Sequence, residues 1–303
     1  MGLIFFFRLP PDPPAPSQRP AVYRFFGLGG GVPFDDDRTV SSPYIRPLHL
    51  GVVRLLLGFY GFTAFFVYFC ILISQSNKFL RKQAWKLIGD IMFHSYLGMT
   101  SYFLFAGCHS LLFARESRNP LSTWPRTMQL AHILLQTTAL TFPLFCTIIY
   151  LYWILPSLPG WYTRSLTQWS TITFYMLNTL FSLVELVLSA STPRPWSHLI
   201  VIILLLGLYL AFHSILVAAS GGKIWIYTVL KYSLPINHGW ISAVRAIGLC
   251  VLGGISFCIM QLLLWIKCQY LGGLKFYGIV QDNITTQRGG IKEGGDRSQG
   301  AIA

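Results

Sequence analysis

The segment His198–Ser220, HLIVIILLLGLYLAFHSILVAAS, runs for 23 residues without a single Lys, Arg, Asp or Glu. An α-helix of about 20 residues is long enough to cross the ~30 Å hydrocarbon core of a bilayer. Helix is the expected conformation, because a chain surrounded by lipid must satisfy its own backbone hydrogen bonds. The segment therefore predicts a transmembrane helix.

Five further segments have the same apolar character: Val52–Ser74, Ile91–Ala114, Met128–Leu155, Thr171–Ala190 and Ala246–Ile266. Only 11% of the 303 residues are charged, whereas soluble domains approach a quarter. A soluble protein with six buried core helices is disfavoured, because too little polar chain would remain to cover them. We expect an all-α, polytopic membrane protein with a six-transmembrane-helix bundle.

The flanks of this bundle differ in composition from the spans. Residues 1–45 are rich in Pro, Gly and Arg, and we expect a disordered, cytosolic N-terminal region. Residues 46–268 form the predicted transmembrane domain, and the Gly-rich residues 269–303 a predicted disordered tail. The tail contains the glycosylation sequon Asn283-Ile284-Thr285, which matters only if the tail is lumenal.

The net charge of +13 raises the question of partners. Lys and Arg lie in short loops and tails, so anionic lipid head groups, rather than nucleic acid, are the expected contacts. Cations near the membrane divide almost evenly between the two sides, and those farther along the tails favour cytosolic termini. With no targeting peptide before the first span, the endoplasmic reticulum or another endomembrane is the expected location.

The six cysteines all lie in or beside apolar runs, and no CxxC spacing occurs. They are expected to pack as small hydrophobic side chains, so neither a disulfide framework nor a zinc site is indicated. No metal, nucleotide or other cofactor is expected.

Polar residues inside spans are the candidates for function. Glu185 is the one acid inside a predicted span, and Asn178 and Ser182 share its helical face. Such groups either mark functional sites or form interhelical hydrogen bonds. Interhelical bonding is favoured for Asn178 and Ser182. For Glu185 we expect a cavity or a histidine partner, and His109 lies at a matching depth.

A hydroxyl, a phenol and an imidazole fall at similar depth on three spans. Ser95 and Tyr175 are each four residues into spans that run the same way, ~6 Å inside one face. His213 is seven residues from the end of its span, ~10 Å from that face. His132 lies near a span end, where its side chain is expected to reach the interface.

Five segments carry a family resemblance: GMTSYFLFAGCHSLLFA (Gly98–Ala114), ALTFPLFCTIIYLYWIL (Ala139–Leu155), LNTLFSLVELVL (Leu177–Leu188), WSHLIVIILLLGLYLAF (Trp196–Phe212) and GGKIWIYTVL (Gly221–Leu230). In this order they resemble the androgen-induced, FAR-type family of integral membrane proteins, in particular its divergent fungal-type members. The resemblance covers roughly residues 45–265.

The resemblance implies a six-helix bundle and a catalytic mechanism. Characterised members are threonine hydrolases that cleave fatty acid esters of hydroxy fatty acids, with a Thr on the second helix and a His on the fourth. In the register of YFLFAGCH the Thr position falls on Ser95, and Thr100 is a nearby alternative. In the register of Glu185 the His position falls on Tyr175, and a neutral phenol is a poor general base.

Three functional classes follow from these residues. In the first, Ser95 or Thr100 is the nucleophile of a lipid-ester hydrolase and His213 has become its base. In that reading His109, Asn178 and Glu185 contact the substrate. In the second, hydrolysis is lost and the bundle binds lipid or a partner. The third is a small-solute transporter, for which the chain lacks the internal repeat and paired interrupted helices of carriers.

Overall fold

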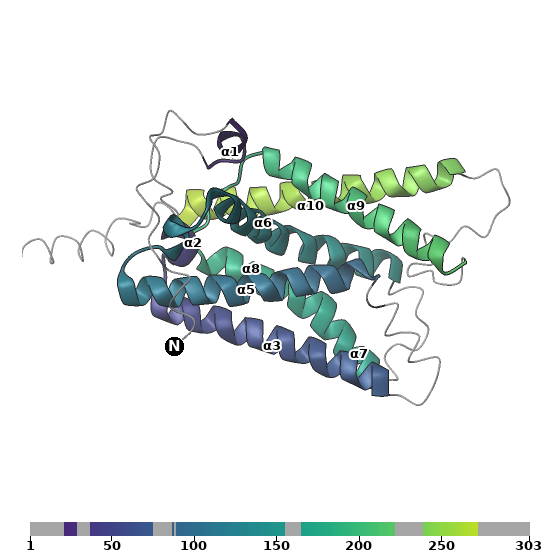
Figure 1. Ribbon diagram of the computed structural model, residues 1–303, viewed down its shortest axis with the longest axis horizontal. Coiled ribbons are helices and arrows are strands. Elements are labelled where there is room, and N and C mark those ends of the chain that lie inside the picture. The colour runs from purple at the N-terminus through teal and green to yellow at the C-terminus, as the bar shows by residue number, and fades with distance from the viewer. Residues whose placement is uncertain are drawn as a thin grey trace, which may run out of the picture.

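The computed structural model describes residues 21–28, 37–74, 87, 89–154, 165–221 and 239–271. Within these ranges the chain is helical and has no strand. Its long helices lie side by side in one bundle (Figure 1). They are α3 (Pro47–Ser74), α5 (Ile91–Glu116), α6 (Arg126–Ile149), α8 (Asn178–Leu188), α9 (Ser197–Ala219) and α10 (Gly239–Leu271).

Two of the six spans contain a π-helical segment. The third span continues from α6 into η4 (Tyr150–Ile154), and the fourth runs through α7 (Ser165–Thr171), η7 (Ile172–Leu177) and α8. All six are long and apolar enough to cross a membrane, and their bounds lie within a few residues of the predicted ones. The predicted all-α, six-helix membrane bundle is therefore confirmed.

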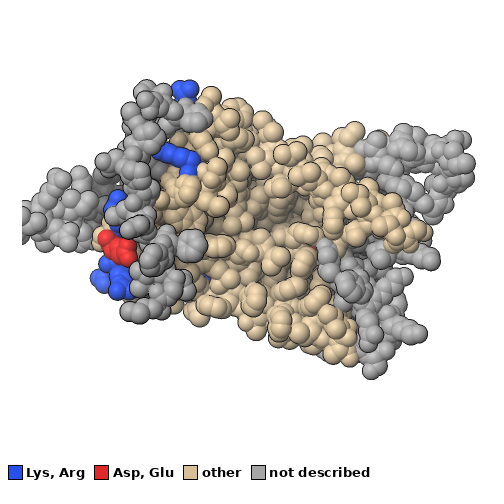
Figure 2. All heavy atoms as spheres, in the orientation of Figure 1, with Lys and Arg blue, Asp and Glu red and all other residues tan. Residues whose placement is uncertain are grey.

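An even number of spans places both ends of the transmembrane domain on one side. We call the end of the bundle where α3 begins and α10 ends the terminal face, and the other end the opposite face. Charged side chains visible in Figure 2 gather at the terminal face, and the band beside it is uncharged. This distribution is that of a protein whose middle lies in lipid.

Helices α3 and α5 approach each other closely because α3 presents glycines to α5. A methyl group at Gly51 or Gly58 would lie 2.8 Å from Leu111 or Leu104 respectively. At Gly61 it would lie 2.5 Å from the Thr100 hydroxyl oxygen. Small residues at such contacts let helix backbones approach in lipid, where van der Waals packing drives association.

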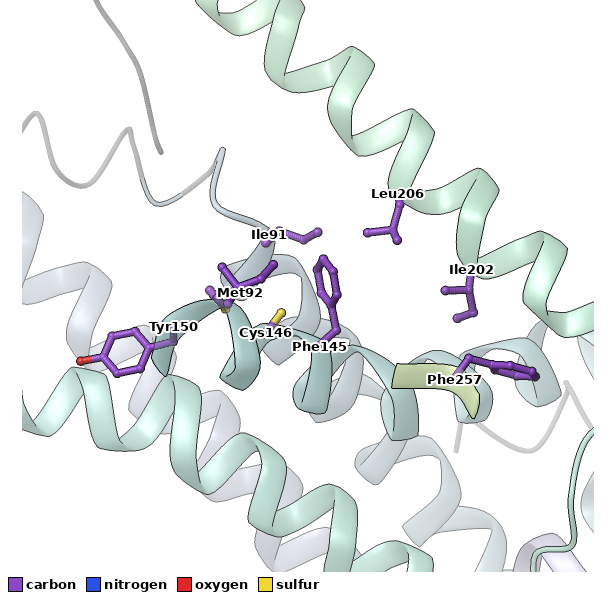
Figure 3. Close-up of a cluster of buried hydrophobic side chains, with 9 residues drawn as sticks. Ile91, Met92, Phe145, Cys146, Tyr150, Ile202, Leu206 and Phe257 are labelled. Atoms are coloured by element: carbon purple, nitrogen blue, oxygen red, sulfur yellow. The ribbon is translucent and has the colours of Figure 1, made fainter. Parts of the chain in front are cut away.

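A core of large side chains fills the space between α5, α6, α9 and α10. Figure 3 shows Phe145 reaching from α6 toward Ile91 of α5 and Leu206 of α9. Phe257 of α10 belongs to the same cluster, together with Cys146. Large apolar side chains are also exposed on the outside of α3, α9 and α10, where lipid would cover them.

Part of the N-terminal region is folded, which corrects the prediction of disorder for residues 1–45. Two short helices, α1 (Ala21–Phe25) and α2 (Asp37–Val40), dock on the terminal face. Leu28 and Val40 are 4% and 0% exposed. Composition could not predict this docking, because the docking depends on backbone carbonyls that accept hydrogen bonds from the bundle. Residues 1–20, 29–36 and 272–303 lie outside the described residues.

Candidate functional site: two buried polar clusters

A buried ion pair joins the first and fourth spans near the terminal face. Arg54 Nε donates to Glu185 Oε2 at 3.0 Å, and Nη2 donates to Oε1 at 2.5 Å. The side chains are 1% and 2% exposed. Nη1 of Arg54 also donates to Ser110 Oγ at 2.7 Å and to the Thr39 carbonyl at 2.8 Å. These bonds link α3, α5 and α8 to the docked α2.

The pair continues into a network of neutral side chains. Tyr102 donates its hydroxyl proton to Glu185 Oε1 at 2.6 Å, and Gln136 Nε2 donates to Tyr102 at 3.0 Å. Gln136 Nε2 also donates to Ser191 Oγ at 2.8 Å, and Gln136 Oε1 accepts from Arg194. The acid expected to mark a cavity is thus enclosed by hydrogen bonds, and its evident role is to hold four helices together.

The structure does not pair Glu185 with His109, so that expectation is wrong. His109 instead packs edge-on against Trp124, with ring centroids 4.8 Å apart, and its Nδ1 has no hydrogen-bond partner. His132, expected at the interface, is 5% exposed and lies 5.1 Å from His109 between ring centroids. The equal depth of His109 and Glu185 along their spans did not predict the partner of Glu185, because Arg54 approaches Glu185 from a third helix.

A second buried cluster forms around Ser95, nearer the opposite face. Asn178 Nδ2 donates to Ser95 Oγ at 3.3 Å, and Cys146 lies beside Ser95. Tyr175 packs on the hydrophobic cluster that contains Cys146, and its ring centroid is 4.0 Å from that of Tyr150. The structure therefore brings together three predicted site residues, Ser95, Asn178 and Tyr175. We call these three residues with Cys146 the Ser95 cluster.

The π-helical segment of the fourth span shapes this cluster. A π-helix leaves carbonyls without their usual intrahelical donors, and such segments recur at functional sites. Here Thr147 on α6 donates to the Tyr175 carbonyl at 2.8 Å and lies 2.7 Å from Thr179 Oγ1. Thr179 and Ser182 in turn donate to the carbonyls of Pro143 and Leu140, each at 2.9 Å. Ser182 is thus an interhelical contact, as expected.

The two remaining predicted catalytic residues lie apart from this arrangement. Thr100 is buried against Gly61 at the α3–α5 contact, which is a packing role. His213 is 4% exposed on α9, and its ring centroid lies 6.3 Å from that of Tyr209. Among the described residues, no histidine ring hydrogen-bonds to the hydroxyl of Ser95 or of Thr100.

A shallow apolar groove of about 380 Å³ lies between α9 and α10. Ile247 and Val251 on its wall are more than half exposed, so the groove opens toward lipid. Its walls offer no polar side chain other than a thiol. Its lining residues are Leu199, Ile203, Ala246, Ile247, Cys250, Val251 and Gly254.

Sequence reasoning missed Arg54, Gln136 and Lys267 as members of buried clusters. Arg54 lies near the start of the first predicted span, yet it follows seven residues of α3 and lies well inside the helix. Its position within an apolar run was the available signal, because an ionisable side chain at that depth needs a partner. Gln136 carried no comparable signal, since uncharged polar residues are frequent in spans.

Comparison with protein-family models, with curated proteins and with solved structures finds no match.

Proposed function

We propose that this chain is a membrane protein that binds the polar group of a lipid at the Ser95 cluster without hydrolysing the lipid. One observation carries the proposal: the Ser95 hydroxyl accepts a hydrogen bond from an amide, and no imidazole in the described ranges bonds to it. A serine nucleophile needs a base to remove its proton. The Asn178 amide donates to the oxygen and cannot do so.

A buried polar atom without a hydrogen-bond partner supports lipid binding at this cluster. Asn178 is fully buried, and its Oδ1 has no hydrogen-bond partner. The Ser95 hydroxyl accepts from Asn178 and is also hydrogen-bonded with the Cys146 thiol. The cluster therefore offers one unpaired acceptor, Asn178 Oδ1, inside an apolar bundle. Buried polar atoms of this kind normally have a partner, and a lipid's hydroxyl, acid or amide group would supply it.

The placement of Ser95 and Tyr175 supports the resemblance to the androgen-induced, FAR-type family. The resemblance assigns a nucleophile to position 95 and an imidazole to position 175. These two positions lie 80 apart in the chain, yet both side chains border Cys146. A bundle inherited from a hydrolase would keep the two positions together after the imidazole was lost, and would retain the lipid-binding site.

Hydrolysis by Ser95 and His213 is the second candidate. Its support is the burial of His213 in the half of the bundle that holds Ser95. Tyr209, one turn earlier on α9, packs on the hydrophobic cluster that contains Cys146 and donates to the Gly89 carbonyl at 2.9 Å. In this reading a substrate would have to draw His213 to the Ser95 hydroxyl.

Labelling with a fluorophosphonate probe separates the two candidates. We expect no labelling of the purified full-length chain. The double substitution Ser95→Thr/Tyr175→His places the family's pair in the cluster, and we expect it to be labelled, whereas Ser95→Ala/Tyr175→His is not. Labelling of the unaltered chain that is abolished by Ser95→Ala and by His213→Ala would establish hydrolysis instead.

Lipid binding is tested by crosslinking a photoactivatable fatty alcohol to the chain in detergent. We expect Asn178→Leu to reduce capture several-fold, because it removes the acceptor. Thr63→Val, which changes an exposed hydroxyl on α3, should leave capture unchanged. Equal capture by all three chains would contradict a site at the Ser95 cluster. We further propose an endoplasmic reticulum or other endomembrane location with both termini cytosolic, which the cations farther along the two tails favour.

A further inference from the structure

Lys267 lies in a corner of the terminal face where α10 meets the end of α8. It is four residues before the end of α10, about 6 Å along the helix, and is 7% exposed. Its Nζ donates to the carbonyls of Leu186 and Ser189, at 2.8 and 2.9 Å. Leu186 lies in the last turn of α8 and Ser189 is the C-cap residue of that helix, so neither carbonyl has an intrahelical donor.

The charge of Lys267 is only partly compensated. An ammonium has three N–H donors, and the two carbonyls use two of them. The one salt bridge in the described part of the chain joins Arg54 and Glu185, so Lys267 forms none there. The Glu185 carboxylate lies near enough to interact with the charge of Lys267, but Arg54 already neutralises it. A helix C-terminus supplies roughly half a negative charge. One N–H and part of the positive charge of Lys267 therefore remain.

A second cation lies in the same corner. Gln261, six residues before Lys267 on α10, accepts from the Arg194 backbone N at 2.9 Å and donates to its carbonyl at 2.5 Å. This clamp fixes the Arg194 backbone beside α10, while the Arg194 guanidinium donates to Gln136 Oε1. The charges of Arg194 and Lys267 lie near enough to interact. Trp196, two residues farther, is 65% exposed, as is usual for an aromatic residue at the lipid interface. The corner thus lies at head-group depth.

The surrounding face adds to the positive field. Apart from the corner itself and the buried Arg54–Glu185 pair, its described cations outnumber its described acids by six to two. The cations are Arg24, Arg38, Arg46, Arg115, Arg118 and Arg126; the acids are Asp37 and Glu116. Figure 2 shows charged side chains gathered at this end. Such a field raises the local concentration of anions.

We propose that the corner formed by Lys267 and Arg194 binds the phosphate group of an anionic phospholipid. The phosphate accepts the remaining N–H of Lys267 and neutralises the excess charge, while the acyl chains extend beside α10. Basic pockets between spans are known to hold anionic head groups in this way. The inference is independent of lipid binding at the Ser95 cluster, which lies toward the opposite face.

Thermal unfolding of the full-length chain in a neutral detergent tests this site. The added probes are dioctanoyl phosphatidylserine, dioctanoyl phosphatidylcholine and inorganic phosphate. Lys267→Gln is the informative variant, because its amide can still donate to the α8 carbonyls while the charge is lost. Lys267→Arg keeps the charge, and Arg118→Gln removes an exposed cation from the same face.

We expect phosphatidylserine to raise the unfolding temperature more than phosphatidylcholine does, and inorganic phosphate to have no effect. Lys267→Gln should weaken the apparent affinity for phosphatidylserine about five-fold, whereas Lys267→Arg and Arg118→Gln stay within two-fold. An unchanged affinity in Lys267→Gln would show that Lys267 only caps α8. Equal stabilisation by phosphatidylcholine or by inorganic phosphate would also overturn the proposal.

Discussion

Arg54 and Glu185, 131 positions apart in the chain, meet inside the bundle through two parallel hydrogen bonds. The pair draws the first span against the fourth and, through Tyr102 and Ser110, against the second. A buried ion pair contributes little compared with well-packed apolar side chains, but a lone buried charge is strongly destabilising. The pair therefore specifies which helices pack together more than it adds stability.

Removal of one partner of the ion pair should lower stability strongly, because the other charge is left buried and unpaired. We expect Glu185→Gln or Arg54→Leu to lower the free energy of unfolding by about 3–5 kcal/mol. Thermal unfolding in detergent, followed by size-exclusion chromatography, measures the loss. Glu116→Gln, at an exposed acid on α5, is the control and should have little effect. The double substitution Arg54→Met/Glu185→Leu should recover most of the stability; a double variant as unstable as the single ones would contradict this account.

The glycine contact between α3 and α5 predicts a steric effect. Gly58→Ala would place a methyl group 2.8 Å from Leu104 Cδ2 and 3.1 Å from its backbone N. We expect a loss of about 1–3 kcal/mol, typical of overpacking, in the same unfolding assay. Gly248→Ala adds a methyl group with nothing within 4 Å and should not destabilise the chain.

Gly61→Ala gives a related test with a defined rescue. Its methyl group would lie 2.5 Å from Thr100 Oγ1. We expect Thr100→Ala, combined with Gly61→Ala, to restore part of the lost stability because the obstructing hydroxyl is gone. A double variant that is less stable than Gly61→Ala alone would show that Thr100 does more than pack.

The hydroxyl contacts of the π-helical segment also predict that removing one of them lowers the free energy of unfolding. Thr147→Val keeps the shape of the side chain but removes one of two donors to the Tyr175 carbonyl, which also accepts from the Asn178 backbone N. We expect a loss of about 0.5–1.5 kcal/mol, the usual net contribution of one hydrogen bond. Thr63→Val at an exposed position of α3 is the matched control. Indistinguishable unfolding temperatures for the two variants would mean that the Thr147 hydrogen bond adds nothing to the stability of the bundle.

Docking of the N-terminal region depends on Gly27. Its φ is +83°, and a Cβ there would lie 2.8 Å from Pro195 Cγ. Ser197 Oγ holds the preceding helix by donating to the Phe25 carbonyl at 2.8 Å. We expect Gly27→Ala to release this region, so that trypsin cleaves after Arg24 several times faster. Gly221→Ala has a similar positive φ without the clash, and it should leave the cleavage rate unchanged.

The proposed orientation predicts which sequons carry glycans. With cytosolic termini, Asn283 stays unmodified, and endoglycosidase treatment leaves the mobility of the expressed chain unchanged. Lys231→Asn creates a sequon with Ser233 between the fifth and sixth spans, which the proposed orientation assigns to the lumenal side. We expect that variant to be glycosylated. A glycan on Asn283 would place both termini in the lumen.

The sequence alone determined the spans and several local contacts. Hydropathy is a property of each segment by itself, so six apolar runs predicted six helices with nearly the observed bounds. Ser182 was recognised as an interhelical contact because a hydroxyl in lipid needs a nearby acceptor. Docking of α1 and α2 could not be inferred, since it depends on backbone carbonyls, which composition does not reveal.

Only the tertiary structure decided which polar groups meet. Depth along a helix can be counted from the sequence. The rotation of each helix and the order in which the helices pack cannot be read in this way. Depth, rotation and packing order together decide which side chains meet. Ser95, Asn178 and Tyr175 proved to be neighbours, whereas Glu185 turned to Arg54 instead of His109. The physical reason is that a charge inside a lipid-embedded bundle pairs with whichever opposite charge packing brings near, and packing is a property of the whole chain.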